Sequence, residues 1–177
     1  MLEYLTQALV LGRRSHKESD LTVDLFTKDF GRLEARVIGG RRITSKLSPH
    51  LDVFNLATVR LAEKNRITVT DAFTERRFGK ERRSPEFYPA VFRILSLVRA
   101  LTPKAEPDLH LWHSLVKGIS SADGDIRIFL KILGYDPRGA ECDICHAGTV
   151  LFFRTADQSF FCAKCGLKMN GDGLIYF

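Results

Sequence analysis

The sequence lacks any segment that would cross a membrane or direct the chain out of the cell. Its 177 residues contain no run of 18 apolar residues, which argues against a membrane-spanning helix. The opening stretch, MLEYLTQALVLGRR, has neither the charged start nor the small-residue cleavage site of a signal peptide. We therefore expect a cytoplasmic protein, in which cysteines stay reduced.

Familiar catalytic motifs are also missing. The sequence has no P-loop, no GxGxxG, no HExxH and no GxSxG. Its five histidines, at positions 16, 50, 110, 113 and 146, do not pair with an evident nucleophile. His110 and His113 stand three apart on an expected helix, a spacing that suits a metal pair but is more common among solvated histidines. We expect a binding protein without enzymatic turnover and assign no catalytic residue.

Cysteine is scarce, yet all four cysteines fall into two C-x-x-C pairs. Cys142 and Cys145 form the first pair, Cys162 and Cys165 the second, and residues 146–161 separate them. This spacing is typical of a zinc ribbon, in which four thiolates close a tetrahedral structural site and leave no position for water. The alternatives are two disulfides, which a reducing compartment disfavours, or four unrelated thiols. His146 is expected to be a surface neighbour rather than a ligand.

Positive charge is unevenly distributed. The formal net charge is +6 and the sequence pI about 9.3. Residues 1–83 hold 17 Lys and Arg against 11 Asp and Glu, a difference of +6, whereas residues 84–177 hold 10 of each. Such asymmetry points to a polyanionic partner, most often nucleic acid. The alternative is a soluble protein that is merely basic.

The first half of the chain reads as five short strands without an intervening helix. Alternating or apolar segments occupy residues 7–14, 21–27, 32–40, 54–63 and 66–78. Gly31 supplies a turn residue between the second and third, and Asn65 marks a turn between the last two. Five strands with a basic surface predict a small barrel of the OB-fold type.

A helical period follows the polar break at residues 79–85. The first helix is expected from Glu86 to the TPKAEP stretch, and Asp108 is expected to cap a second with Leu109 and Trp112 in its core. Asp123 or Asp125 is expected to cap a third, which Gly134 ends. Residues 150–154 and 159–165 predict a hairpin. The predicted fold is α+β: an OB-fold domain (1–80), a helical domain (81–141), and a zinc ribbon with a C-terminal tail (142–177).

Basic residues of the barrel half are the candidate nucleic-acid contacts, because Lys and Arg neutralise phosphates. The predicted DNA-binding residues are Arg13, Arg14, Lys17, Arg36, Arg41, Arg42, Lys46, Arg76 and Arg77, with Arg32, Lys80, Arg82 and Arg83 as further candidates. Arg41 and Arg42 follow Gly39-Gly40, and a flexible loop with paired charges suits backbone contact. The alternative for these arginines is a solvated rim. Phe26, Phe30 and Phe54 are possible stacking residues, although burial is the commoner fate.

The order of these parts resembles the RecO family of bacterial DNA repair and recombination mediators. The matching stretches are ALVLGRRSHKESDLTVDLFTKDFGRLEARVIGGRRITSKL, LDVFNLATVRL, FLKILGYDPRGAECDIC and FFCAKC. Within them, Glu18-Ser19-Asp20, Gly40-Arg41-Arg42 and the LGYDP of residues 133–137 are similar to the family pattern. The resemblance covers nearly the whole chain.

The resemblance implies an N-terminal OB-fold, a helical domain and an inserted zinc ribbon holding a structural Zn²⁺. It further implies binding of single- and double-stranded DNA, annealing of complementary strands, and help in loading recombinase onto DNA coated with single-strand-binding protein. The implied partners are RecR and the acidic tail of single-strand-binding protein, and the implied location is the cytoplasm, at the nucleoid. Family members usually continue with further helices beyond the last cysteine, so we carry over no partner-binding residue. A second class of function also fits the residues: a protein–protein adaptor whose ribbon and helices form the interaction surface.

Overall fold

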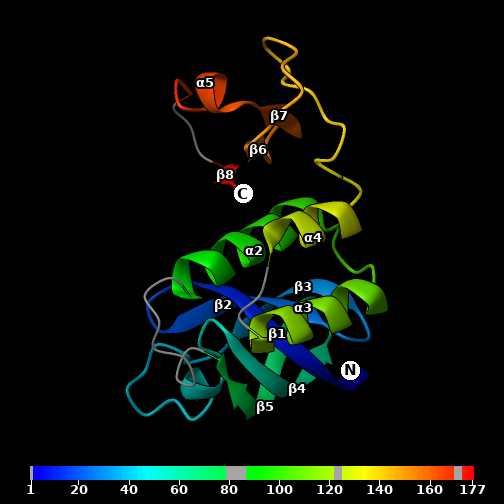
Figure 1. Cartoon of the computed structure of the whole chain (residues 1–177). Helices are drawn as coiled ribbons and strands as arrows, with labels where there is room; N and C mark the ends of the chain where they lie inside the picture. Colours follow the sequence, from blue (N-terminus) through cyan, green and yellow to red (C-terminus); the bar gives the residue numbers. More distant parts are fainter. Residues whose placement is uncertain (1, 79–86, 122–124, 170–172) are drawn as a thin grey trace.

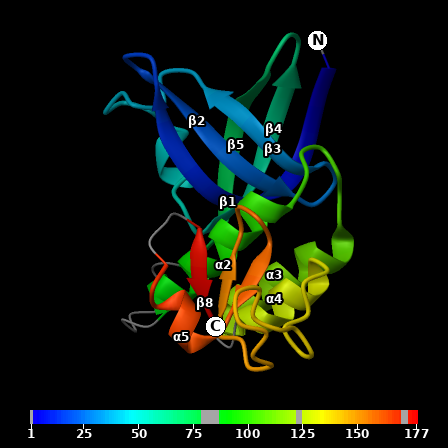
Figure 2. The same cartoon turned by 90° about the horizontal axis from the view of Figure 1, so that it is seen from above.

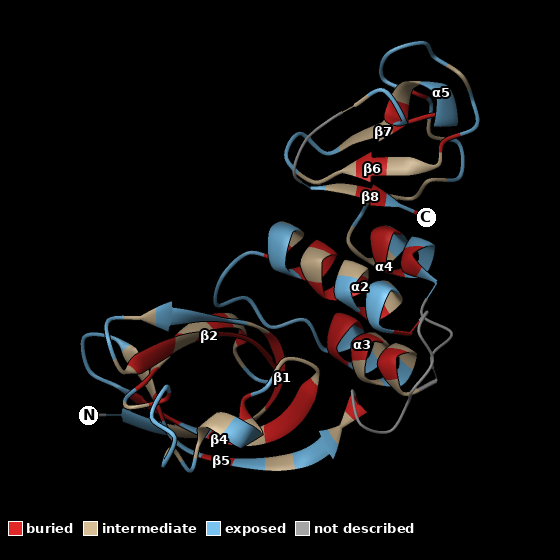
Figure 3. Cartoon of the chain, turned by 90° about the vertical axis from the view of Figure 1, so that its left-hand side faces the viewer, coloured by how far each residue is buried: buried red, intermediate tan, exposed pale blue. Residues whose placement is uncertain are grey.

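The computed structural model describes residues 2–78, 87–121, 125–169 and 173–177. Within these residues a barrel, a layer of helices and a small sheet follow one another along the molecule (Figures 1 and 3). The expected polar break at residues 79–85, the expected boundary between residues 80 and 81, and Asp123 lie outside the described residues. None of the described helices is both long and apolar enough to cross a membrane.

The N-terminal strands close into a five-stranded barrel. The strands are β1 (Leu2–His16), β2 (Asp20–Thr27), β3 (Gly31–Val37), β4 (Asn55–Glu63) and β5 (Ile67–Arg77), in the order β1-β2-β3-β5-β4. All neighbours are antiparallel except β3 and β5, which pair in parallel at Arg36 and Thr68. A short 3-10 helix, η1 (Ser48–His50), lies in the connection from β3 to β4. The predicted barrel of the OB type is confirmed.

Strand β1 is longer than the expected segment of residues 7–14. Its first part, from Leu2 to Leu9, pairs with β4, and its second part, from Ala8 to His16, pairs with β2. A register shift near Gly12 lets one strand turn from the first partner to the second. The N-terminal extension escaped prediction because Leu2 and Leu5 face solvent, which hides the usual alternation.

Strand β2 is buried on both faces. Val23 and Leu25 belong to the barrel core, while Asp24 and Phe26 on the opposite face are also buried. The ring of Phe26 stacks on Trp112 with ring centroids 6.3 Å apart, which places Trp112 in the helical core, as expected. One face of the barrel is therefore an internal surface on which the helices pack (Figure 2).

The helical layer consists of α2 (Phe87–Leu101), α3 (Leu109–Ser121) and α4 (Ile126–Ile132). The expected caps are confirmed: the carboxylate of Asp108 accepts from the Leu111 amide at 2.8 Å, and that of Asp125 from the Arg127 amide at 3.0 Å. One core assignment was wrong. Leu109 is 54% exposed because it opens the first turn of α3, and Leu111 takes the core position at 1% exposure.

The C-terminal lobe (residues 142–177) holds a three-stranded sheet. Strands β6 (Phe152–Arg154) and β7 (Ser159–Phe161) form the predicted hairpin, and helix α5 (Ala163–Gly166) follows. The chain end returns as β8 (Leu174–Tyr176), which pairs with the other side of β6. Ile175 and Phe177 pack into the same core as the helices, so the apolar tail joins the lobe to the rest of the molecule.

Candidate metal centre and nucleic-acid interface

The four cysteines meet in the C-terminal lobe. Their sulfur atoms all lie within 4.8 Å of one another, and Sγ of Cys145 is 3.6 Å from Sγ of Cys162. Sulfurs bound to one tetrahedral zinc at about 2.3 Å stand about 3.8 Å apart. A disulfide needs a separation of about 2.05 Å. The arrangement therefore fits a four-thiolate metal centre and not a pair of disulfides.

Backbone hydrogen bonds hold the two cysteine pairs in register. The amide of Asp143 donates to the carbonyl of Phe160 at 2.9 Å, and the amide of Phe160 donates back to the Asp143 carboxylate at 2.6 Å. This reciprocal contact fixes the first cysteine pair against strand β7, which leads into the second. The side chain of His146 is 79% exposed and does not belong to the sulfur cluster, which agrees with its expected place on the surface.

The thiols show why a cation suits this cluster. Backbone amides, first that of Cys162, lower the pKa of the Cys142 thiol to about 6. Burial, together with the neighbouring sulfurs, raises the pKa of the Cys165 thiol to about 12. Thiolates packed this closely repel one another, and a divalent cation among them removes the repulsion.

Arginines from two separate segments line a pocket on the barrel. Arg13 and Arg14 come from the end of β1, and Arg41 and Arg42 come from the turn after β3. The pocket, here called the arginine pocket, measures about 360 Å³ and is completed by Ser15, Leu21, Gly40 and Ser48. Two arginine pairs distant in sequence thus share one concave surface.

Asp20 holds the turn that carries Arg41 and Arg42. Its carboxylate accepts from the Gly39 amide at 2.8 Å and from Nε of Arg36 at 2.9 Å. These two donors, the Gly39 amide first, lower the pKa of the Asp20 carboxyl. The Arg41 amide donates to the Ser19 carbonyl at 2.8 Å, and Gly39 takes a φ of +64°. At this turn, hydrogen bonds to the β1–β2 connection and to the start of β2 hold the loop that was expected to carry the paired charges.

A second pocket continues the arginine pocket across β2 and β3. It measures about 340 Å³, and its lining residues are Arg14, His16, Thr22, Glu34, Ala35, Arg36, Arg66 and Ile67. We call it the β2–β3 groove, and the two pockets together the basic face. Arg14 lines both, so they adjoin. In OB-folds this strand face and its flanking loops are the surface that binds oligonucleotides.

Ion pairs neutralise some of the basic face but not all of it. Arg13 pairs with Asp52, Arg14 lies 2.9 Å from Glu34, and Arg36 pairs with Asp20. Within the described residues, Arg41, Arg42 and Arg66 form no ion pair. The uncompensated charge therefore lies at the turn after β3, which lines the arginine pocket, and at the turn between β4 and β5, which lines the β2–β3 groove.

Comparison with known proteins shows which family model and which proteins are similar in sequence to this chain. The family described as "Recombination protein O N terminal" matches residues 1–72, which hold the barrel strands up to most of β5. DNA repair protein RecO of Rhodopirellula baltica is 28% identical over 151 residues, covering 78% of this chain and 56% of that protein. The protein of the same name from Dehalococcoides mccartyi is 25% identical over 183 residues, covering 96% and 72%.

The chain is similar to RecO proteins along most of its length. A further RecO, from a Nocardioides species, is 29% identical over 182 residues and covers 92% of this chain and 74% of its own length. The chain thus spans little more than half of the Rhodopirellula protein and nearly three quarters of the other two. RecO similarity extends beyond the barrel, through the helices and into the cysteine lobe.

The predicted contacts separate into two groups in the structure. Arg13, Arg14, Arg36, Arg41 and Arg42 line the basic face. Lys17 lies beside it, because its carbonyl accepts from Nη1 of Arg41 at 3.3 Å.

The other predicted contacts line neither pocket of the basic face. Lys46 is exposed in the connection after β3, and Arg77 ends β5. Arg76 donates to Oγ of Ser120 at 3.1 Å and lies over the Phe78 ring, at the junction with α3. Lys80, Arg82 and Arg83 lie outside the described residues.

The further candidate Arg32 has a structural place. Its Nε donates to the Thr102 carbonyl at 3.1 Å, and its Nη1 lies 3.7 Å from the buried Asp24. These contacts join β3 to the segment after α2. No phenylalanine, tyrosine or tryptophan lines the basic face among the described residues, because Phe26 is buried and Phe54 packs against Tyr88.

Arg66 and His16 are the groove residues that sequence reasoning missed. Arg66 lies in the Lys64-Asn65-Arg66 turn between β4 and β5, and that turn borders the groove once the barrel closes. The available signal was the basic turn itself, since the loop between the fourth and fifth strands flanks the binding surface of OB-folds. His16 ends β1 and offered no comparable signal.

Proposed function

We propose that this protein binds DNA through the basic face of its barrel and acts as a recombination mediator in DNA repair. In this role it anneals complementary strands and helps load recombinase onto DNA coated with single-strand-binding protein, without enzymatic turnover. The observation that carries the proposal is the meeting of Arg13, Arg14, Arg41 and Arg42 in one pocket that adjoins the β2–β3 groove. Similarity to proteins that are named DNA repair proteins supports it.

The chemistry of the basic face favours contact with the phosphate backbone. Guanidinium groups bind phosphate oxygens in two-pronged fashion and release counterions, which gives affinity that falls with salt and tolerates any sequence. The lining residues include no large aromatic side chain on which bases would stack. We therefore expect both single- and double-stranded DNA to bind, because both present phosphates.

The metal has a structural part in this proposal. Four thiolates fill the coordination sphere of zinc, so a Zn²⁺ held by Cys142, Cys145, Cys162 and Cys165 has no position for a reactive water. Its contribution is to fold the lobe. The protein partners that we propose are RecR and single-strand-binding protein. The location that we propose for this protein is the cytoplasm, at the nucleoid.

Removing the uncompensated charge of the turn after β3 tests the DNA-binding step. In the double variant Arg41→Ala/Arg42→Ala, binding of a fluorescent oligonucleotide should weaken, and the slope of log K against log salt should fall by about 1 to 2. The measurement is fluorescence anisotropy at several salt concentrations, with a single-stranded and a double-stranded probe.

A matched control removes two exposed charges from the neutral half. Arg127→Ala/Lys131→Ala on α4 should leave affinity and slope unchanged. Equal losses of affinity in both double variants would mean that only the net charge of the protein matters. An unchanged salt slope in the Arg41/Arg42 variant would mean that this turn does not contact DNA. No binding at all by the unmodified protein in low salt would favour an adaptor role.

Strand annealing tests the mediator role itself. The protein should accelerate pairing of complementary oligonucleotides, both bare and coated with single-strand-binding protein, and the Arg41/Arg42 variant should lose this acceleration. DNA binding without faster annealing would leave a DNA-binding protein but refute the mediator proposal.

A further inference from the structure

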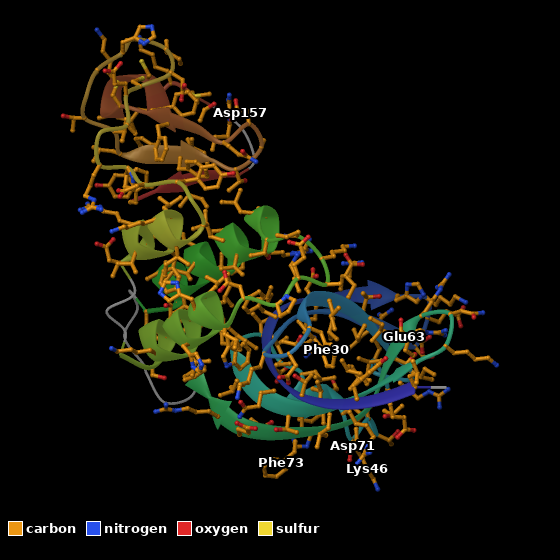
Figure 4. The ribbon with its side chains drawn as sticks, turned by 90° about the vertical axis from the view of Figure 1, so that its right-hand side faces the viewer. Phe30, Lys46, Glu63, Asp71, Phe73 and Asp157 are labelled. Atoms are coloured by element: carbon orange, nitrogen blue, oxygen red, sulfur yellow. The ribbon has the colours of Figure 1, made fainter. Side chains whose placement is uncertain are left out.

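An apolar pocket with an acidic rim opens at one end of the barrel, apart from the arginine pocket. Its volume is about 280 Å³, and its lining residues are Tyr4, Asp29, Phe30, Leu33, Leu61, Glu63, Ile67, Ala105 and Pro107. We call it the mouth pocket. Figure 4 looks toward this end of the barrel, with Phe30 inside the ring of strands and Glu63 toward its rim.

The barrel wall explains why a pocket forms here. Strands β3 and β5 pair only at Arg36 and Thr68 among the described residues, so their backbone ladder does not seal the wall beside Leu33 and Ile67. Leu33 and Leu61 belong to the barrel core, while Tyr4, Phe30 and Ile67 are half-buried and pack against that core. The pocket therefore reaches the apolar interior through a gap that side chains only partly fill.

The rim of the mouth pocket is already in place. The amide of Ala105, in the segment between α2 and α3, donates to the Arg32 carbonyl at 2.9 Å. On the other side, the rings of Tyr4 and Phe30 meet edge to face with centroids 5.0 Å apart. A site whose walls are fixed in advance loses little conformational entropy when it binds.

Two carboxylates set the charge of the mouth pocket. Neither Asp29 nor Glu63 forms an ion pair within the described part of the chain, although the protein carries a net charge of +6. Asp29 accepts a hydrogen bond from Oγ1 of Thr6 at 2.6 Å, which orients its carboxylate. Unpaired carboxylates next to aromatic rings repel phosphate and attract cations.

We propose that the mouth pocket binds a lysine or arginine side chain presented by a partner protein. The alkyl stem would lie against Leu33, Leu61 and Ile67, the cationic head beside Asp29 and Glu63, and the rings of Tyr4 and Phe30 would add cation–π attraction. The size of the pocket suits a single side chain, since sites for larger ligands usually measure about 300 to 1,000 Å³. The site shares no residue with the arginine pocket and only Ile67 with the β2–β3 groove, and the inference does not rest on the proposed function.

Short peptides that differ only in the head group test this inference on the whole chain. The probes are acetyl-Gly-Lys-Gly-amide, acetyl-Gly-Arg-Gly-amide and the norleucine peptide, which keeps an alkyl stem but has no charge. Titrations followed by ¹⁵N NMR should give saturable shifts at the amides of Phe30, Gly31 and Glu63 with both cationic peptides. The norleucine peptide should bind at least about fivefold more weakly than the two cationic peptides.

Variants locate the effect. Glu63→Gln should weaken binding of the lysine peptide about threefold to fivefold, because it removes one exposed carboxylate without changing the shape of the pocket. Asp71→Asn is the matched control, since Asp71 is an exposed carboxylate of the same barrel that does not line the mouth pocket. Equal loss in both variants would overturn the inference.

Three further outcomes would also overturn it. Equal affinity for the lysine and norleucine peptides, or no saturable shift with any peptide, would remove the cationic ligand. Tight binding of 1,4-diaminobutane with no binding of the peptides would assign the pocket to free amines instead of a partner protein.

Discussion

The barrel and the cysteine lobe differ in both charge and construction. Residues 1–83 carry the whole excess of positive charge, whereas residues 84–177 are formally neutral. The barrel has strands of 7 to 15 residues that close on themselves, while each strand of the lobe has only three. A closed barrel around a large apolar core is stable without a further cross-link. Three-residue strands over a small apolar cluster need one. The most recognisable motif of the sequence, the pair of C-x-x-C segments, therefore lies in the cysteine lobe. We expect this lobe to have a structural role and not to form the binding surface.

The core of the lobe shows what the metal would add. Among the described residues, the cluster around the cysteines has Cys142, Phe161 and Cys162 as its buried members, whereas Phe153, Ile175 and Phe177 join the helical core instead. The part of the lobe that contains Phe153, Ile175 and Phe177 thus packs into the core of the helices. The stability of the part that holds the cysteines depends on the bonds of its own metal ligands.

Removing one ligand should give the largest effect and separate the two regions. Cys162→Ser should abolish metal binding, which contributes of the order of 10 kcal/mol to folding of four-thiolate sites, and should unfold the cysteine half of the lobe. Metal content measured by atomic absorption and hydrogen exchange across residues 142–177 should both change, while exchange in β1 to β5 should not.

His146→Ala is the control for this variant, because His146 neighbours the ligands without joining them. If Cys162→Ser kept its metal and its melting temperature, or if the barrel unfolded with the lobe, the division into two regions would fail.

A substitution at the barrel–helix junction should have the next largest effect. A Cβ at Gly31 would lie 1.9 Å from the Glu106 carbonyl oxygen, and Gly31 has a φ of +66°. Gly31→Ala should lower the free energy of unfolding by about 2 to 4 kcal/mol through strain and displaced backbone.

Urea denaturation measures this loss, with Gly148→Ala as the matched control, since a Cβ at Gly148 meets nothing within 4 Å. Equal stability of the Gly31 variant and the unmodified protein would show that the segment between α2 and α3 does not constrain the barrel.

The smallest expected effect concerns Asp20 and pH. Its folded pKa lies below the ordinary value of 3.8, because the Gly39 amide and Arg36 favour the charged form. A depressed pKa contributes stability above pH 3.8, and this contribution is lost as the pH falls through the folded value. Urea denaturation between pH 2.5 and about pH 6 should therefore show a shallower loss in Asp20→Asn than in the unmodified protein. Parallel pH curves would mean that Asp20 does not hold the turn.

Much of the fold was predictable because its signals are local. Alternating apolar residues mark β2 and β4, and Asp108 and Asp125 mark helix starts through their own side chains. The role of Leu109 was mispredicted because a pattern of apolar residues does not reveal which of two neighbours, Leu109 or Leu111, faces the core. The length of β1 was missed because Leu2 and Leu5 are exposed and because the extension depends on pairing with β4, more than fifty residues away in the chain.

The candidate site was predictable only in part for the same reason. Arg41 and Arg42 stood out as a charged pair after two glycines, yet their anchoring depends on Asp20, which lies on another strand. Arg76 looked equivalent in the sequence but packs at the junction with α3, because β5 runs away from the basic face. The mouth pocket had no sequence signal, since its lining residues come from five separate segments of the chain.

The sequence by itself determined the barrel, the helices, the cysteine cluster and the net charge of each half. These follow from short-range periodicity, from the spacing of Cys142 to Cys165 and from composition. Only the tertiary structure decided which cations share a surface, which are neutralised, and where an acidic pocket opens on a basic protein. The physical reason is that electrostatic interactions and pockets depend on distances between side chains in space. Closure of the barrel sets those distances for residues that lie far apart in the chain.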